Sequence, residues 1–116
     1  MSKQVVKIEL AYVSDPKQIM KFVGVLDSGR LTQDEMYGIA REYQDGSLNH
    51  YPFILEAETD ECEDFTVSWG YYNNDTVKIT FAPRPLLVGQ EVIRTDYDEK
   101  QPSETTYKIV EITVLI

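Results

Sequence analysis

Alternation of apolar and polar residues along short segments is the feature of this sequence that most constrains its fold. Every second residue from Val6 to Tyr12 is apolar or aromatic, and Lys7 and Glu9 occupy the opposite side. Strands have a side-chain period of two, so this pattern predicts a strand with one buried face. Further strands are predicted over 51–58, 65–72, 77–81, 87–92 and 105–116. We therefore expect a mostly antiparallel β-sheet of about six to seven strands.

The segments 65–72 and 77–81 are predicted to pair as a hairpin. A loop of three residues, 73–75, gives the cross-strand pairs Val67–Phe81, Trp69–Ile79 and Tyr71–Val77. This register puts every large apolar group on one face, whereas a slip by one residue would turn all of them to the other face. In this arrangement Tyr72 points outward beside Thr76.

Residues 33–44 carry the pattern of one principal α-helix. Thr32 and Glu35 have the spacing of a capping box, in which each side chain accepts from the other residue's backbone amide. The apolar residues at helical spacing are Met36, Ile39, Ala40 and Tyr43. Asp45-Gly46 predicts the end of the helix. A helix packed on the antiparallel sheet makes the expected fold class α+β.

The segment 17–26 allows two interpretations. Asp15 followed by Pro16 is typical of a helix start. The run Phe22–Leu26 favours a buried strand instead, because Gly24 is a poor residue for a helix interior. The strand is the preferred interpretation.

With 116 residues and no internal repeat, we expect one domain over 1–116.

The net charge of -9 restricts the classes of partner. Residues 1–31 hold five bases and three acids, so the excess of acids belongs to the rest of the chain. Nucleic acid and anionic membranes repel such a surface, because binding to them depends on Lys and Arg. A basic protein surface is the partner that this charge favours.

Acidic residues gather in two places that are candidates for partner binding. The first group is Glu56, Glu58, Asp60, Glu61, Glu63 and Asp64. The second lies on the expected loop of the last hairpin and contains Asp96, Asp98 and Glu99. The exposed aromatic Tyr72 is a further candidate contact. For the first group, a solvated loop, a docking surface for Lys or Arg, and a hard-metal site all stay open.

No pattern in the sequence indicates catalysis or a cofactor. His50 is the single histidine and Cys62 the single cysteine, and neither lies in a motif of nucleophilic catalysis or metal binding. The first residues have no apolar run typical of a signal peptide, so we expect a cytoplasmic protein. An exposed apolar edge strand would allow homo-oligomers.

These observations lead to three functional hypotheses. The first is a non-catalytic acidic module that inhibits a basic, nucleic-acid-handling protein stoichiometrically, as phage anti-defence and toxin-immunity proteins do. The second is a small-molecule-binding domain or small enzyme with a pocket between helix and sheet, which a deep, well-lined cavity in the structure would favour. The third is a structural or assembly subunit.

Overall fold

The protein is an all-β barrel. The computed structural model describes residues 3–69, 76–98 and 101–116, and these residues form strands but no helix. The strands are β1 (Lys3–Tyr12), β2 (Asp15–Asp27), β3 (Arg30–Leu31), β4 (Glu35–Gln44), β5 (Ser47–Ala57), β6 (Asp64–Trp69), β7 (Thr76–Thr80), β8 (Glu91–Asp98) and β9 (Gln101–Val114). The expected α+β class is therefore wrong.

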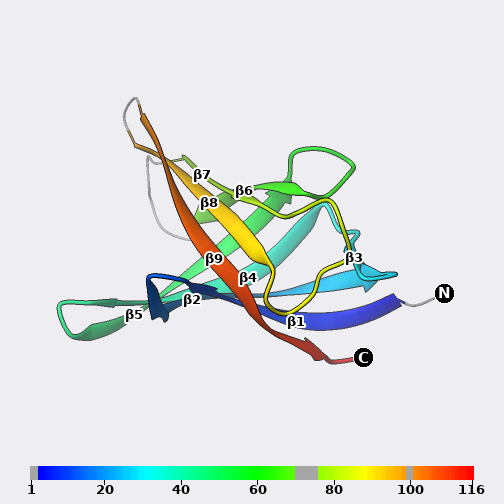
Figure 1. The fold of residues 1–116 in the computed structure, drawn as a ribbon, viewed down its shortest axis with the longest axis horizontal. Helices are drawn as coiled ribbons and strands as arrows, with labels where there is room; N and C mark the ends of the chain where they lie inside the picture. Colours follow the sequence, from blue (N-terminus) through cyan, green and yellow to red (C-terminus); the bar gives the residue numbers. More distant parts are fainter. Residues whose placement is uncertain (1–2, 70–75, 99–100) are drawn as a thin grey trace.

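Eight of these strands close into an antiparallel barrel (Figure 1). The order around the barrel is β1-β9-β8-β7-β6-β5-β4-β2, and β2 pairs back with β1. The short β3 pairs with the last residues of β2. Closure leaves each barrel strand paired on both sides, which removes the open edges of a flat sheet.

The predicted helix over 33–44 is wrong because β4 occupies that segment. Met36 and Ala40 are buried, but Ile39 and Tyr43 are about half exposed, so the burial follows a period of two. Antiparallel ladders to β2 and β5 hold β4 on both sides. Local helix propensity is a weak preference that tertiary pairing overrides.

The presumed caps of that helix have other roles. Thr32 does not pair with Glu35; its amide and its hydroxyl both donate to the carbonyl of Val25, each at 3.2 Å. Asp45 and Gly46, with φ of 52° and 77°, form the two-residue turn between β4 and β5. Asp-Gly in this left-handed conformation is a hairpin turn rather than a helix end.

The preferred interpretation of 17–26 as a strand is confirmed by β2. The β6–β7 hairpin has the predicted facing, because Phe65, Val67 and Ile79 are all buried. Its predicted register is wrong, since Val67 pairs with Val77 and Phe65 with Ile79. The partner of Val67 moves by four residues, from Phe81 to Val77. Any even shift keeps every side chain on its face, so alternation could not distinguish the two registers.

A bulge between β1 and β9 explains why the last strand is apolar on both sides. Glu9 pairs with Glu111, but the next residue, Leu10, pairs with Ile109. The extra residue Val110 changes which side chains of β9 face inward, as bulges do. Ile109 before the bulge is buried, and Ile112 after it packs against the core.

The barrel has one closed end. The hairpins β1–β2, β4–β5 and β8–β9 lie at the opposite end, on the left of Figure 1, and both termini lie on the right. At the closed end the segment 82–90 crosses the barrel, and the amide of its buried residue Leu86 donates to the Gly29 carbonyl at 2.8 Å. The described residues include no helix that is long and apolar enough for a membrane span.

Candidate functional site

The inward-facing side chains change from apolar to polar towards the hairpin end of the barrel. On β4 the buried residues Met36 and Ala40 are followed on the same face by Glu42. On β8 the buried Val92 is followed by Arg94 and then Asp96. This end therefore differs from the filled apolar core, and we call it the mouth.

The mouth contains a cavity of about 450 Å³. Residues of five strands, β1, β2, β4, β8 and β9, line it: Tyr12, Gln18, Glu42, Tyr43, Gln44, Arg94, Asp96, Ser103, Thr105 and Tyr107. This volume lies within the range of about 300–1,000 Å³ that is typical of small-molecule sites. A cavity was the observation expected to favour the small-molecule-binding hypothesis, although this one lies at a barrel end and not between a helix and a sheet.

Arg94 is the central polar residue of the mouth. Its side chain is 13% exposed, and its guanidinium donates to both carboxylate oxygens of Asp96, from Nε at 2.8 Å and from Nη2 at 3.1 Å. Nη1 donates to the Tyr107 hydroxyl at 3.4 Å. The guanidinium carbon also lies 5.5 Å from the centre of the Trp69 ring, a cation–π distance. These contacts hold the guanidinium in one place.

Arg94 keeps its positive charge in spite of its burial. Burial by itself lowers the pKa of Arg94, but the hydrogen bonds to Asp96 and the negative charges of Asp96 and Glu42 outweigh it. The net effect is a pKa above the usual arginine value. The mouth therefore contains a permanent cation between two carboxylates.

Two tyrosines form one wall of the cavity. The rings of Tyr12 and Tyr107 stack with centroids 5.4 Å apart and an angle of 28° between their planes. Burial raises the pKa of Tyr107, and the nearby Arg94 only partly opposes this increase. The Tyr107 phenol is therefore a neutral hydrogen-bonding group at physiological pH.

Gln18 joins two strands at the rim. Its amide nitrogen donates to the Tyr43 carbonyl at 3.2 Å, and its amide oxygen accepts from the Tyr43 amide at 2.9 Å. The β2–β4 ladder ends at the pair Ile19–Arg41, so this side chain continues the pairing where the backbones separate. Gln18 thus keeps the opening between β2 and β4 in a defined shape.

Glu42 has the fewest direct partners of the charged residues in the mouth. One oxygen of its carboxylate lies 3.7 Å from Nη1 of Arg94, which is an ion pair beyond hydrogen-bond distance. Its side chain is 23% exposed and lines the cavity. The Glu42 oxygens are thus available to a ligand, whereas both oxygens of Asp96 already accept from Arg94.

The first acidic group of the sequence lies at the closed end, around the connection from β5 to β6. Glu56 accepts from the Ser68 hydroxyl at 2.8 Å, Glu58 pairs with Lys78 at 3.1 Å, and Asp64 accepts from Thr80 at 2.9 Å. Asp60 and Glu61 are exposed on the connection itself, and Glu61 and Glu63 line a small hollow with Arg30 and Arg84. The structure brings these six acids together on one side of the barrel.

The second acidic group does not extend that surface. Asp96 faces into the mouth, and Asp98 is the last residue of β8 at the hairpin end. The two groups therefore lie at opposite ends of the strands. Tyr72 and Glu99 lie outside the described residues. Among the side chains that are described, no group of three or more His, Cys, Asp or Glu is placed to hold a metal ion.

Sequence reasoning missed Arg94, Glu42, Gln18 and the tyrosine pair of the mouth. Polar residues at inward positions of otherwise apolar strands were the available signal, as in the order Val92, Arg94, Asp96. That signal is meaningful only when the inward face of every strand is known, and the segment containing Glu42 was assigned to a helix.

Comparisons with known proteins give no indication of the function. No protein-family model, no curated protein and no solved structure matches the chain.

Proposed function

We propose that this protein is a non-catalytic binding protein that holds a small polar molecule in the mouth of its barrel. The observation that carries the proposal is the cavity of about 450 Å³ built around the fixed Arg94 guanidinium. Buried charges are costly unless they are paired, so a charged network in a barrel otherwise filled with apolar side chains needs a reason. Binding a polar ligand in an organised, partly desolvated site is such a reason.

The arrangement of groups supports binding rather than catalysis. The guanidinium is already paired with Asp96, and the described residues of the mouth include no histidine, cysteine or lysine. Histidine is the most frequent general base in enzymes, and cysteine and lysine are common nucleophiles. The groups that remain are tyrosine faces, amides, hydroxyls and the Glu42 carboxylate, which orient a ligand by stacking and hydrogen bonding.

A matched pair of threonine variants tests the proposal. Thr105 lines the mouth on β9, whereas Thr95 lies on the alternate face of β8, where it pairs with Lys78 and Glu104. Thr105→Phe fills the cavity, and Thr95→Phe adds the same ring outside it. Each protein is dialysed against the small-molecule fraction of an extract of its own host, and mass spectrometry identifies the retained compounds.

We expect the wild type and Thr95→Phe to retain the same polar compound and Thr105→Phe to lose it. The proposal is wrong if all three proteins retain the same compounds or if none retains any, provided that each unfolds cooperatively on heating.

A second candidate function is docking of a basic protein on the acidic side of the closed end. The observation that favours it is the direct cross-strand pair of Glu35 and Glu56, two like charges next to the rest of the first acidic group. Like charges opposite each other destabilise a sheet, and a basic partner would relieve that cost. In this candidate the protein is the stoichiometric antagonist expected from its charge.

Affinity purification from the host at low and at moderate salt tests the docking candidate. A basic protein that is retained at low salt and lost on raising the salt supports it, because exposed charge pairs are screened. Replacing Glu56 and Glu58 with Gln should release that protein, whereas Glu111→Gln on β9 should not. A partner that is retained equally at both salt concentrations contradicts an electrostatic interface.

A further inference from the structure

From the charges and ring faces of the mouth we infer that its ligand is an organic ammonium ion with an aromatic or short apolar body, whose positive charge pairs with Glu42. This inference rests on the proposed function, because it names the chemical class of the molecule held there.

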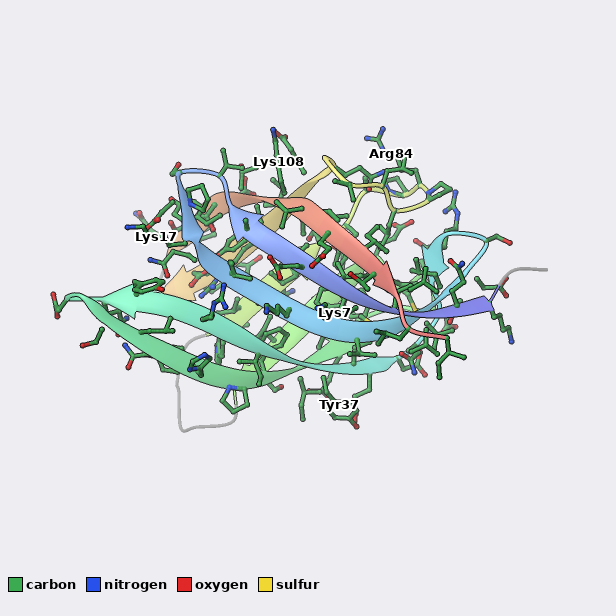
Figure 2. The ribbon with its side chains drawn as sticks, turned by 90° about the horizontal axis from the view of Figure 1, so that it is seen from below. Lys7, Lys17, Tyr37, Arg84 and Lys108 are labelled. Atoms are coloured by element: carbon green, nitrogen blue, oxygen red, sulfur yellow. The ribbon has the colours of Figure 1, made fainter. Side chains whose placement is uncertain are left out.

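The lining of the cavity carries a net negative charge. Arg94 contributes one positive charge, and Glu42 and Asp96 contribute one negative charge each. The cations labelled in Figure 2, Lys7, Lys17, Arg84 and Lys108, are not part of the lining. A cleft lined by one sign of charge in an acidic protein concentrates ions of the opposite sign.

Arg94 is a poor site for an anion. Nε and Nη2 are engaged by Asp96, Nη1 faces Tyr107 and Glu42, and one side of the guanidinium plane is near Trp69. An anionic ligand would have to displace the two-point bond to Asp96 and would approach two carboxylates. The same geometry gives Arg94 a structural role, because it holds Asp96 and Tyr107 in place.

Glu42 and the tyrosines suit an ammonium group. The ion pair of 3.7 Å between Glu42 and Arg94 leaves the Glu42 carboxylate free to accept hydrogen bonds from a second cation. The stacked rings of Tyr12 and Tyr107 add aromatic faces to the same cavity. Cations bind over aromatic faces by the ring quadrupole, more strongly where water is excluded.

Three probes of one shape and different charge test the inference: benzylammonium, benzyl alcohol and benzoate. Each is titrated up to about 10 mM into ¹⁵N-labelled protein at constant ionic strength, a range that detects millimolar affinity. The reporters are the amides of Gln18, Glu42, Thr105 and Tyr107 and the indole N–H of Trp69, the single tryptophan. We expect benzylammonium to shift these signals at a concentration at least about tenfold lower than either other probe.

Two variants assign that preference to its source. Glu42→Gln keeps the shape of the side chain and should reduce the affinity for benzylammonium about tenfold, to the level of benzyl alcohol. Glu111→Gln, on the exposed part of β9 outside the mouth, should leave the affinity unchanged.

The possible outcomes distinguish the chemical class of the ligand from the position of the binding site. Equal or tighter binding of benzyl alcohol or benzoate at the same reporters overturns the ammonium class and leaves the mouth as the binding site. The absence of shifts at these reporters with all three probes contradicts both the ammonium class and the proposed function.

Discussion

The Arg94 guanidinium and the Asp96 carboxylate, two residues apart on the inner face of β8, are joined by two parallel hydrogen bonds of 2.8 and 3.1 Å. Residues at positions i and i+2 of a strand share a face, so β8 itself places these two side chains next to each other. The pair brings a fixed cation and its counter-ion into a barrel whose remaining core is apolar. This ion pair is the charged centre of the cavity lining.

Replacing Asp96 with Asn should destabilise the protein by about 1–2 kcal/mol, because it leaves a largely buried guanidinium with a weaker partner. The free energy of unfolding in urea measures the loss. The matched change is Glu9→Gln, which breaks the longer ion pair of 3.6 Å with Lys21. The Lys21 side chain is 36% exposed, against 13% for Arg94, so water can replace the lost partner and the cost should be less than about 0.5 kcal/mol. Equal losses in the two variants would show that the Arg94–Asp96 pair contributes no more to the free energy of unfolding than the Glu9–Lys21 pair.

Gly38→Ala distinguishes the strand from the predicted helix by the sign of its effect. A Cβ at Gly38 would lie 2.0 Å from the carbonyl oxygen of Lys21 and 2.8 Å from the Phe53 ring, so the neighbouring backbone must move. We expect a loss of more than about 2 kcal/mol, whereas alanine in a helix would add about 1 kcal/mol. Thermal and urea unfolding measure the change.

Gly46→Ala is the control for that variant. A Cβ at Gly46 meets no atom within 4 Å, but its φ of +77° strains any side chain. The expected cost is about 1 kcal/mol, from the backbone alone. A Gly38→Ala protein as stable as Gly46→Ala would be inconsistent with the close contact between β2 and β4.

Stability should fall at alkaline pH partly through Tyr107. Burial raises the pKa of its phenol in the folded protein, so the unfolded chain loses this proton at a lower pH than the folded one. The contribution to stability is complete below the unfolded pKa of about 10 and is lost as the pH rises towards the folded pKa.

Urea unfolding of the wild type and of Tyr107→Phe between about pH 8 and pH 11 measures this effect, because the variant lacks the titrating group. The wild type should lose more stability than Tyr107→Phe over this range. Parallel pH curves would mean that Tyr107 titrates alike in both states.

Cys62 should react slowly with thiol reagents while the protein is folded. Burial raises the pKa of its thiol, and the charges of Asp34 and Asp60 raise it further. Thiolate is the reactive form, so we expect alkylation at least about tenfold slower than in denaturant. The rate of iodoacetamide labelling with and without denaturant measures the difference. Equal rates would show that the closed end of the barrel opens freely.

The sequence was informative about strands and about facing. The alternation from Val6 to Tyr12 predicted β1, and the facing of Phe65, Val67 and Ile79 was predicted correctly because a period of two determines which side chains share a face. The register was wrong because positions two residues apart are equivalent in that pattern. Only contacts with the rest of the barrel select Val67–Val77.

The helix was the largest error, and its cause is physical. In the segment 33–44, Met36 and Ala40 lie four residues apart, a spacing that fits one face of a helix and also one face of a strand. Gly38, between them on the same inner face, completes the strand pattern without adding an apolar side chain. The Asp45-Gly46 turn was the better guide, because this dipeptide is a strong hairpin signal.

The candidate site could not be predicted because it depends on closure of the sheet. Tyr12 on β1 and Glu42 on β4 are far in the sequence from Arg94 and Tyr107 on the β8–β9 hairpin, and closure of the barrel brings all four to one mouth. The first acidic group predicted from the sequence lies instead around the closed end, and Asp96 of the second group faces Arg94. Net charge informs about encounter and solubility, whereas a binding site depends on which groups the fold brings together.

One measurement tests the central claim that the mouth is the functional site. The small-molecule fraction of a host extract is added to ¹⁵N-labelled protein, and the amide shifts are mapped on the barrel. The account predicts shifts concentrated at Gln18, Glu42, Thr105 and Tyr107, with none at Glu56 and Glu58. Shifts confined to the Glu56 and Glu58 side, or no shifts at the mouth, would contradict it.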